Sequence, residues 1–250
     1  MPAVLVAALA LAALAASMLS AVTGVAGGVL LLSGLLLVVP AAAVVPLHGT
    51  VQTAACVTRV ATFRAHVRWD IVRRFVIGVV PGSLLGALVV GLLVQIDGSL
   101  IKLAIAAAIL VSLFAKNLKL APETKSLQVF YWVGLGVGFF GILAGSTGPI
   151  VTQALLVFDV KKEAHVATKS VVQMVGHGLK LPLFGLAVGF DFGAWLVPLA
   201  AMCAAVVVGT LLGKRLLGKL SPERFVTVAR VLLALVVLHV VVTEVYALVA

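Results

Sequence analysis

Two series of polar residues share one spacing within otherwise apolar surroundings. Each has a basic residue, a glutamine four positions later and a second cation seven positions after that. They are His48, Gln52 and Arg59 in the first series, and Lys169, Gln173 and Lys180 in the second. At about 100° per residue, the members of each series share one face of a helix. Since the acidic residues all stand in polar breaks or near expected helix ends, we interpret this pattern as a binding site for an anion.

Glycine-rich stretches near each series supply further donors. Broken helices present free N–H groups and the positive end of the helix dipole, which favour anions. The residues that we assign to anion contact on this basis are Gly24, Gly27, Gly28, Gly145, Ser146, Thr147 and Gly148. For at least half of these glycines, close helix packing is the alternative interpretation.

Some members of the two series have alternative explanations. Lys169 and Arg59 stand near polar turns, so both side chains could extend to the lipid headgroups. Lys180 lies deeper, and Gly178 and Pro182 beside it are expected to open the helix backbone. His48 titrates near neutral pH and is a candidate proton relay, with a core or interfacial histidine as the alternative.

Composition requires these residues to lie in a membrane protein. Of the 250 residues, 63% are hydrophobic and 10% are charged, far from the balance of soluble domains. The chain divides into eight to ten apolar stretches of membrane-spanning length, which predicts an all-α polytopic fold. The formal charge of +10 is explained by cytoplasmic loops, so no nucleic-acid partner is expected. Cys56 and Cys203 stand in apolar segments without metal-ligand spacing, and no metal or organic cofactor is predicted.

The sequence also contains an internal repeat. A shift of 121 residues without gaps aligns rare residues of one half with identical residues of the other: Gly24 with Gly145, Gly27 with Gly148, Gln52 with Gln173, Phe63 with Phe184, and Asp70 with Asp191. We therefore predict two repeats of about five hydrophobic segments each, residues 1–122 and 123–250, which together form one transport domain. The glycine-broken segments near 2–39 and 127–158 are either full spans or hairpins of shorter helices.

Charge orients the two repeats. Most Lys and Arg residues fall in four breaks, at 64–74, 116–125, 161–162 and 214–224, and the positive-inside rule places these breaks in the cytoplasm. The second-half counterpart of 64–74 contains Asp191 and no Lys or Arg, so it is expected outside. The repeats are therefore predicted to be inverted in the cell membrane, with both termini outside. Inverted repeats with a site at their interface are typical of secondary transporters.

Several stretches together resemble a known family. They are GVAGGVLL and GSTGPIVT at the opening of each half, HGTVQ and ATKSVVQ after a turn, FRAHVRWD, and the closing LLGKRLLGKLSPERF. In order and duplication they are similar to the TauE/SafE sulfite-exporter family of bacterial and archaeal membrane proteins, over nearly the whole chain. This resemblance implies a permease that moves sulfite, sulfoacetate or a related organosulfur anion, mostly outward.

The function predicted from these observations is a secondary exporter of a small anion that works by alternating access, with proton or ion coupling left open. Its partners are then the anion and the lipid bilayer. A passive anion channel is the alternative, since it could use the same basic residues. An intramembrane enzyme is less favoured, because the sequence contains neither HExxH nor a convincing serine or paired-aspartate site.

Overall fold

The computed structural model describes residues 2–23, 26–96, 101–107, 126–160, 162–216, 234, 238 and 241–242. Regular secondary structure in these ranges is entirely helical, which confirms the all-α prediction. The main helices are α1 (Ala3–Thr23), α2 (Ala26–Val38), α3 (Ala41–Phe63), α4 (Trp69–Ile96), α6 (Val129–Ala144), α7 (Gly148–Val157), α8 (Lys162–Gly178), α9 (Lys180–Ala187) and α10 (Leu196–Leu216), with short 3-10 turns η1 (Arg64–His66) and η3 (Gly193–Trp195). The predicted basic break at 116–125 and the repeat boundary near 122 lie outside the described residues.

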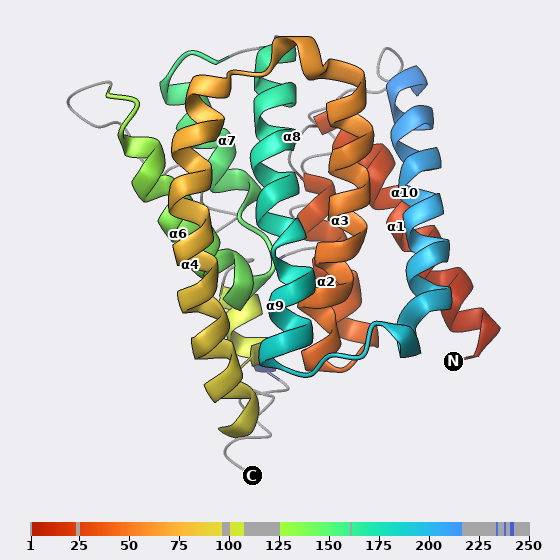
Figure 1. Cartoon of the computed structure of the whole chain (residues 1–250). Coiled ribbons are helices and arrows are strands. Elements are labelled where there is room, and N and C mark those ends of the chain that lie inside the picture. The colour runs from red at the N-terminus through yellow and green to blue at the C-terminus, as the bar shows by residue number, and fades with distance from the viewer. Residues whose placement is uncertain are drawn as a thin grey trace.

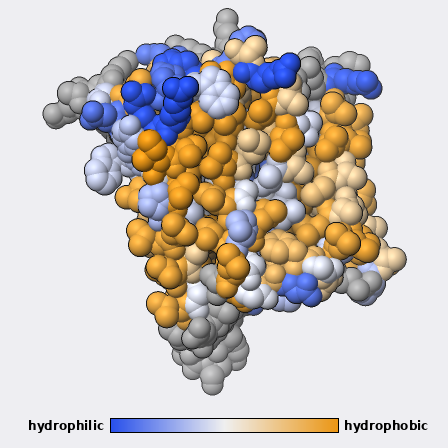
Figure 2. All heavy atoms as spheres, viewed as in Figure 1, coloured by the Kyte–Doolittle hydropathy of each residue, from blue (hydrophilic) through white to orange (hydrophobic). Residues whose placement is uncertain are grey.

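Three of the described helices are long and apolar enough to cross a membrane. Their apolar windows are Ala3–Ser20, Trp69–Leu93 and Gly193–Gly213, in α1, α4 and α10. Large apolar side chains of α4, such as Leu88 and Leu92, remain exposed on the surface of the protein. Apolar residues cover the middle of the molecule, whereas hydrophilic ones gather at the end that holds η1 (Figure 2). This distribution is that of a multi-pass membrane protein.

Two helical pairs are interrupted where the sequence is rich in glycine. Helix α6 ends at Gly145, whose φ of 81° favours glycine, and α7 begins three residues later with Pro149 in its first turn. Helix α7 has 10 residues and α2 has 13, so they are about 15 Å and about 20 Å long. Both are shorter than the hydrocarbon core of a bilayer, which is about 30 Å thick.

The helices of the two halves correspond to one another. A shift of 121 residues places α1, α2, α3 and α4 over α6, α7, the α8–α9 pair and α10, respectively. Helix α4 packs against α6, α1 packs against α10, and α3 packs against α8 near the middle of the molecule (Figure 1). Helix α4 and its counterpart α10 are thus each paired with the first described helix of the other half.

The α4–α6 contact brings two backbones together. A Cβ atom added to Gly82 of α4 would lie 2.1 Å from the carbonyl oxygen of Leu135, and one added to Gly138 of α6 would lie 2.4 Å from that of Val79. Small residues let membrane helices approach this closely, and dispersion contacts between the backbones then stabilise the pair. These glycines explain why α4 and α6 form an extended contact.

Candidate functional site

Lys180 lies inside the helical bundle, at the break between α8 and α9. Its side chain is 1% exposed, and its ammonium group donates a hydrogen bond to the backbone carbonyl of Gly145. Helix α8 ends at Gly178 because Pro182 has no N–H group to donate to the Gly178 carbonyl. A Cβ atom on Gly49 of α3 would lie 2.8 Å from Cδ of Lys180, so this glycine leaves the space that the lysine occupies.

Two histidines accompany Lys180. The Nδ1 atom of His177 lies 3.2 Å from Nζ of Lys180, and the rings of His177 and His48 are 5.4 Å apart in an edge-on arrangement. His48 is fully buried, and its Nε2 atom lies 2.9 Å from the carbonyl oxygen of Gly28. We call His48, His177 and Lys180 the central cluster. It joins α3 of the first half to α8 and α9 of the second.

His177 was not among the site residues predicted from the sequence. On an ideal helix it lies about 80° off the face that the Lys169 series shares, near enough for its side chain to reach a cavity on that face. The usable signal was its spacing of three residues from Lys180, which places two side chains on neighbouring turns.

The two glutamines occupy equivalent places in the two halves. A Cβ atom added to Gly28 near the start of α2 would lie 3.1 Å from Nε2 of Gln52, and one added to Gly148 at the start of α7 would lie 2.9 Å from Nε2 of Gln173. Each amide therefore packs directly on a glycine in the first turn of a short helix. Both members of this contact were predicted site residues in each half.

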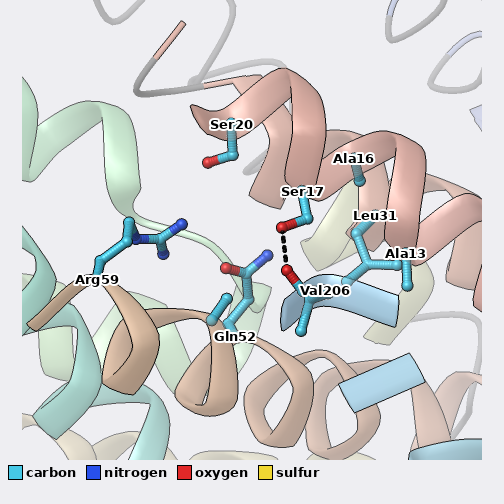
Figure 3. A pocket seen from close by; sticks show the side chains of 9 residues that line it. Ala13, Ala16, Ser17, Ser20, Leu31, Gln52, Arg59 and Val206 are labelled. Atoms are coloured by element: carbon cyan, nitrogen blue, oxygen red, sulfur yellow. Dashed lines mark hydrogen bonds between the residues drawn. The ribbon is translucent and has the colours of Figure 1, made fainter. Parts of the chain in front are cut away.

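A pocket on the first-half side contains the other members of the first series. Its walls come from α1, α2, α3 and α10: Ala13, Ala16, Ser17, Ser20, Leu31, Gln52, Ala55, Arg59 and Val206. Figure 3 shows Gln52 and Arg59 extending from α3 toward the serines of α1. The guanidinium of Arg59 also donates a 3.2 Å hydrogen bond to Sγ of Cys56. The helical spacing thus brings Gln52 and Arg59 together, whereas Lys180 is not part of this pocket wall.

Lys169 is linked electrostatically, through Arg59, to the pocket and to the central cluster. Its side chain is 6% exposed, so it is buried within the bundle instead of extending to the surface. It interacts electrostatically with Arg59, and Arg59 in turn interacts with His177. The cations of the two series therefore influence one another across the interface between the halves.

The remaining predicted residues have mixed placements. A Cβ atom on Gly27 would lie 1.9 Å from the carbonyl oxygen of Ala16, so this glycine serves close packing of α2 on α1. Ser146 is buried in the link between α6 and α7. Thr147 stands at the N-cap of α7, where its carbonyl accepts the first backbone hydrogen bonds of the helix. Gly24 lies outside the described residues.

The charge around the central cluster is one-sided. In the described ranges the acidic residues are Asp70, Asp159, Glu163 and Asp191, and they stand at helix ends or in loops. Asp70 pairs with Arg68 at 2.7 Å near the start of α4, where both side chains reach solvent. No described carboxylate is therefore buried beside Lys180. A buried cation in a membrane protein needs a polar or anionic partner, because leaving the charge uncompensated costs several kcal/mol.

Comparison with known families gives one match: the family described as sulfite exporter TauE/SafE, over residues 9–240. The chain belongs to this family. The match confirms the resemblance that the two glycine-rich openings and the polar series indicated. No curated protein and no solved structure matches the chain. Membership of this transporter family, together with the apolar helices, makes the TauE/SafE chain a multi-pass membrane transport protein.

Proposed function

We propose that this protein exports sulfite or a related small organosulfur anion across the cell membrane by alternating access. The anion is held at the interface of the halves by Lys180, Arg59, Lys169, Gln52 and Gln173. The observation that carries the proposal is the fully buried ammonium of Lys180, which lies at the meeting point of both halves without a described carboxylate beside it. The family match supports sulfite as the first substrate to test.

The halves, residues 1–122 and 123–250, are inverted repeats in this proposal. In Figure 1, α3 runs toward the η1 end whereas the corresponding α8 and α9 run away from it. Helix α4 likewise runs away from that end, and its counterpart α10 runs toward it. Helix α4 pairs with α6 of the other half, and α10 pairs with α1 in the same way. This reciprocal pairing further supports a two-fold relationship centred on the α3–α8 contact. Such halves are suited to rocking about a site near the middle of the bilayer.

The end that holds η1 faces the cytoplasm in this arrangement. Arg64, Arg68, Arg73 and Arg74 cluster there, in and beside η1 and the first turns of α4. Asp191, in the link between α9 and α10, lies at the opposite end (Figure 1). The positive-inside rule then places both termini outside. Arg68 and Asp70 form an exposed pair at this surface and take no part in anion binding.

The donor set fits an oxyanion. Each glutamine amide carries two N–H groups, the guanidinium of Arg59 presents a planar fork, and Lys180 and Lys169 add positive charge. The close approach of each glutamine to a glycine places its amide at the first turn of α2 or α7, where N–H groups of the helix start point outward. During binding, Lys180 exchanges the Gly145 carbonyl for an oxygen of the anion.

Transport of radiolabelled sulfite in proteoliposomes tests this function. With unlabelled sulfite trapped inside and the membrane potential held at zero by potassium and valinomycin, a carrier accumulates external label transiently, whereas a passive channel does not. We expect this counterflow in the wild type and its loss in Lys180→Ala, while the matched control Arg68→Ala transports normally. Monodisperse elution and unchanged thermal unfolding establish that Lys180→Ala is folded. Absence of wild-type flux with sulfite, thiosulfate and small sulfonates rejects the proposed substrate class, and normal flux in Lys180→Ala rejects the site.

A further inference from the structure

We propose that the central cluster binds one proton together with the transported anion, with Nδ1 of His48 as the atom that accepts the proton. This inference rests on the proposed function, because it describes what travels with the anion through the same site. It is carried by the hydrogen-bond pattern of His48, His177 and Lys180.

The contact with Gly28 fixes the tautomer of His48. A backbone carbonyl can only accept a hydrogen bond, so the Nε2 atom of His48, 2.9 Å from the Gly28 oxygen, must carry a hydrogen. In a neutral imidazole the other nitrogen is then an acceptor. This nitrogen, Nδ1, is fully buried and has no hydrogen-bond partner among the described residues. A buried acceptor without a donor is unfavourable by about 1–3 kcal/mol. A proton at this position satisfies the nitrogen but buries a positive charge, so the protonated form needs the charge of a bound anion beside it.

The contact with Lys180 restricts His177 in the opposite way. The ammonium of Lys180 carries only donors, so it donates to Nδ1 of His177 across 3.2 Å. A hydrogen on this nitrogen would point at the N–H groups of the ammonium, so that two donors would face each other. With Lys180 charged, His177 therefore cannot take a proton on Nδ1 in this arrangement. Of the three side chains, His48 alone has an identified vacant acceptor for an added proton.

The Gly145 carbonyl is the second element of the proton site. It accepts a hydrogen bond from Lys180 and also interacts with the ring of His48. Because this carbonyl can only accept a hydrogen bond, it favours the protonated ring of His48 over the neutral one.

The surroundings of His48 make its proton depend on the anion. Lys180 from α9 and His177 from α8 face its ring, and Arg59 acts on His177 from α3. Helices α2 and α7 contain no titratable residue, and α6 contains only Tyr131, in its first turn. The thiol of Cys56 in α3 also acts on Lys180. Among the described residues, the positively charged groups that act on the cluster are Lys180 and Arg59, so a further positive charge on His48 is repelled until an anion enters. By reciprocity, the proton then raises the affinity for the anion by the same factor.

The transfer step is balanced. When hydrogen sulfite enters, its O–H bond breaks, an N–H bond forms at Nδ1 of His48, and the bonding electron pair stays on the sulfite oxygen. When the site opens to the other side, the N–H bond breaks and the proton leaves with the anion. A sulfite dianion that enters with a proton from water reaches the same bound state. Neither route needs a further reactant.

The direct test is 15N NMR of histidine-labelled protein in lipid nanodiscs, titrated with sodium sulfite. We expect sulfite to convert Nδ1 of His48 from the unprotonated to the protonated form at constant pH. His48→Gln identifies the signal by its loss. His66 of η1 is the internal control, since it is exposed at the end of the molecule, away from the cluster and from the residues proposed to hold the anion. An Nδ1 atom that stays unprotonated with saturating sulfite from about pH 5 to about pH 8 overturns the inference.

Flux measurements separate this inference from the proposed function. The ratio of sulfite transport by His48→Gln and by wild type, taken at each pH, removes the effect of sulfite speciation because both proteins meet the same mixture. We expect this ratio to change at least fivefold across the range, and the ratio for His66→Gln, at the exposed η1 turn, to stay constant. A constant ratio for His48→Gln overturns proton binding while leaving sulfite transport in place.

If wild type neither binds nor transports sulfite, the proposed function fails. The proton site is then tested by the protonated fraction of His48 in ligand-free protein. Lys180→Gln removes the nearest positive charge, so a larger fraction of His48 should be protonated in this variant than in wild type at the same pH. An unchanged fraction rejects the cluster as a proton site.

Discussion

The side-chain amide of Gln173 packs on Gly148, and 121 residues earlier in the chain Gln52 packs on Gly28 in nearly the same way. A Cβ atom would lie 2.9 Å from the amide nitrogen in the first contact, and Gly28 is one residue beyond the strict counterpart of Gly148. Both contacts hold a double donor at the first turn of a short helix. The two halves therefore contain similar glutamine–glycine contacts.

Gly148→Ala and Gly28→Ala should each weaken sulfite transport, because the added methyl group displaces the amide that packs on it. Loss of one hydrogen bond to a charged group corresponds to about 1.5–3 kcal/mol, so we expect KM to rise about tenfold or more. Gly34→Ala in α2 and Gly136→Ala in α6 are matched controls, since a Cβ atom on either meets no atom within 4 Å. Transport kinetics that match these controls would contradict a role of the glutamines.

Arg59→Lys should reduce anion affinity even though it keeps the charge. The guanidinium of Arg59 offers a planar fork with several donors, whereas lysine offers a compact point charge. Since Arg59 lines the pocket with Gln52, we expect about a tenfold weaker sulfite affinity for Arg59→Lys and a larger loss for Arg59→Gln. Isothermal calorimetry in detergent measures both, with Arg68→Lys at the exposed surface as the control. Equal affinity in Arg59→Lys and wild type would show that only the charge matters.

Gly82→Ala should destabilise the fold and separate α4 from α6. The added Cβ atom would meet the Leu135 carbonyl at 2.1 Å, and backbone cannot rotate away as a side chain can. Overpacking of this kind costs about 1–3 kcal/mol, so the midpoint of thermal unfolding in detergent should fall by several degrees. Gly136→Ala, on a face of α6 with free space, should leave the midpoint unchanged or raise it. No difference between the two variants would argue against the close α4–α6 contact.

Single cysteines in η1 and in the link between α9 and α10 should react with a labelling reagent from opposite sides of the membrane. In a chain with Cys56→Ala and Cys203→Ala, Asp191→Cys should react with an impermeant maleimide in intact cells. Ala65→Cys in η1 should react only after permeabilisation. Both positions are exposed, so accessibility within the fold does not limit the reaction. Labelling of both from one side rejects the inverted arrangement, and the reverse pattern places the η1 end outside.

The sequence was sufficient for the parts of the fold that depend on local pattern. Apolar composition predicted helices in a membrane, and the offset of 121 residues brings the described helices of one half into the same order as those of the other. The repeat relationship itself stays a prediction. Helical spacing placed Gln52 and Arg59 on one pocket wall because α3 is continuous over both residues. The second series spans α8 and α9, which meet at Leu179. This residue keeps helical dihedral angles, and the helix lacks there the hydrogen bond that Pro182 cannot donate.

Other features depend on tertiary contacts and could not be derived from spacing. Gly27 was assigned to the anion, but it packs α2 against the Ala16 carbonyl of α1. The ring contact between His48 and His177 joins helices from different halves. The pairing of α4 with α6 and of α1 with α10 also crosses the halves, and no residue pattern within one half specifies its partner helix.

The pairing of α1 with α10 can form only late in the synthesis of the chain. Helix α1 ends at Thr23 and its partner begins at Leu196, so the ribosome makes almost the whole chain before the two can meet. At about 5–20 residues per second, the partner follows roughly 10–40 s later. Gly209 of α10 packs against the Leu14 carbonyl of α1. Until α10 is made, this side of α1 must be covered by lipid or by the insertion machinery. Docking of α10 on α1 is therefore a late step of assembly, and a chain that stops before Leu196 leaves this side of α1 without its native partner.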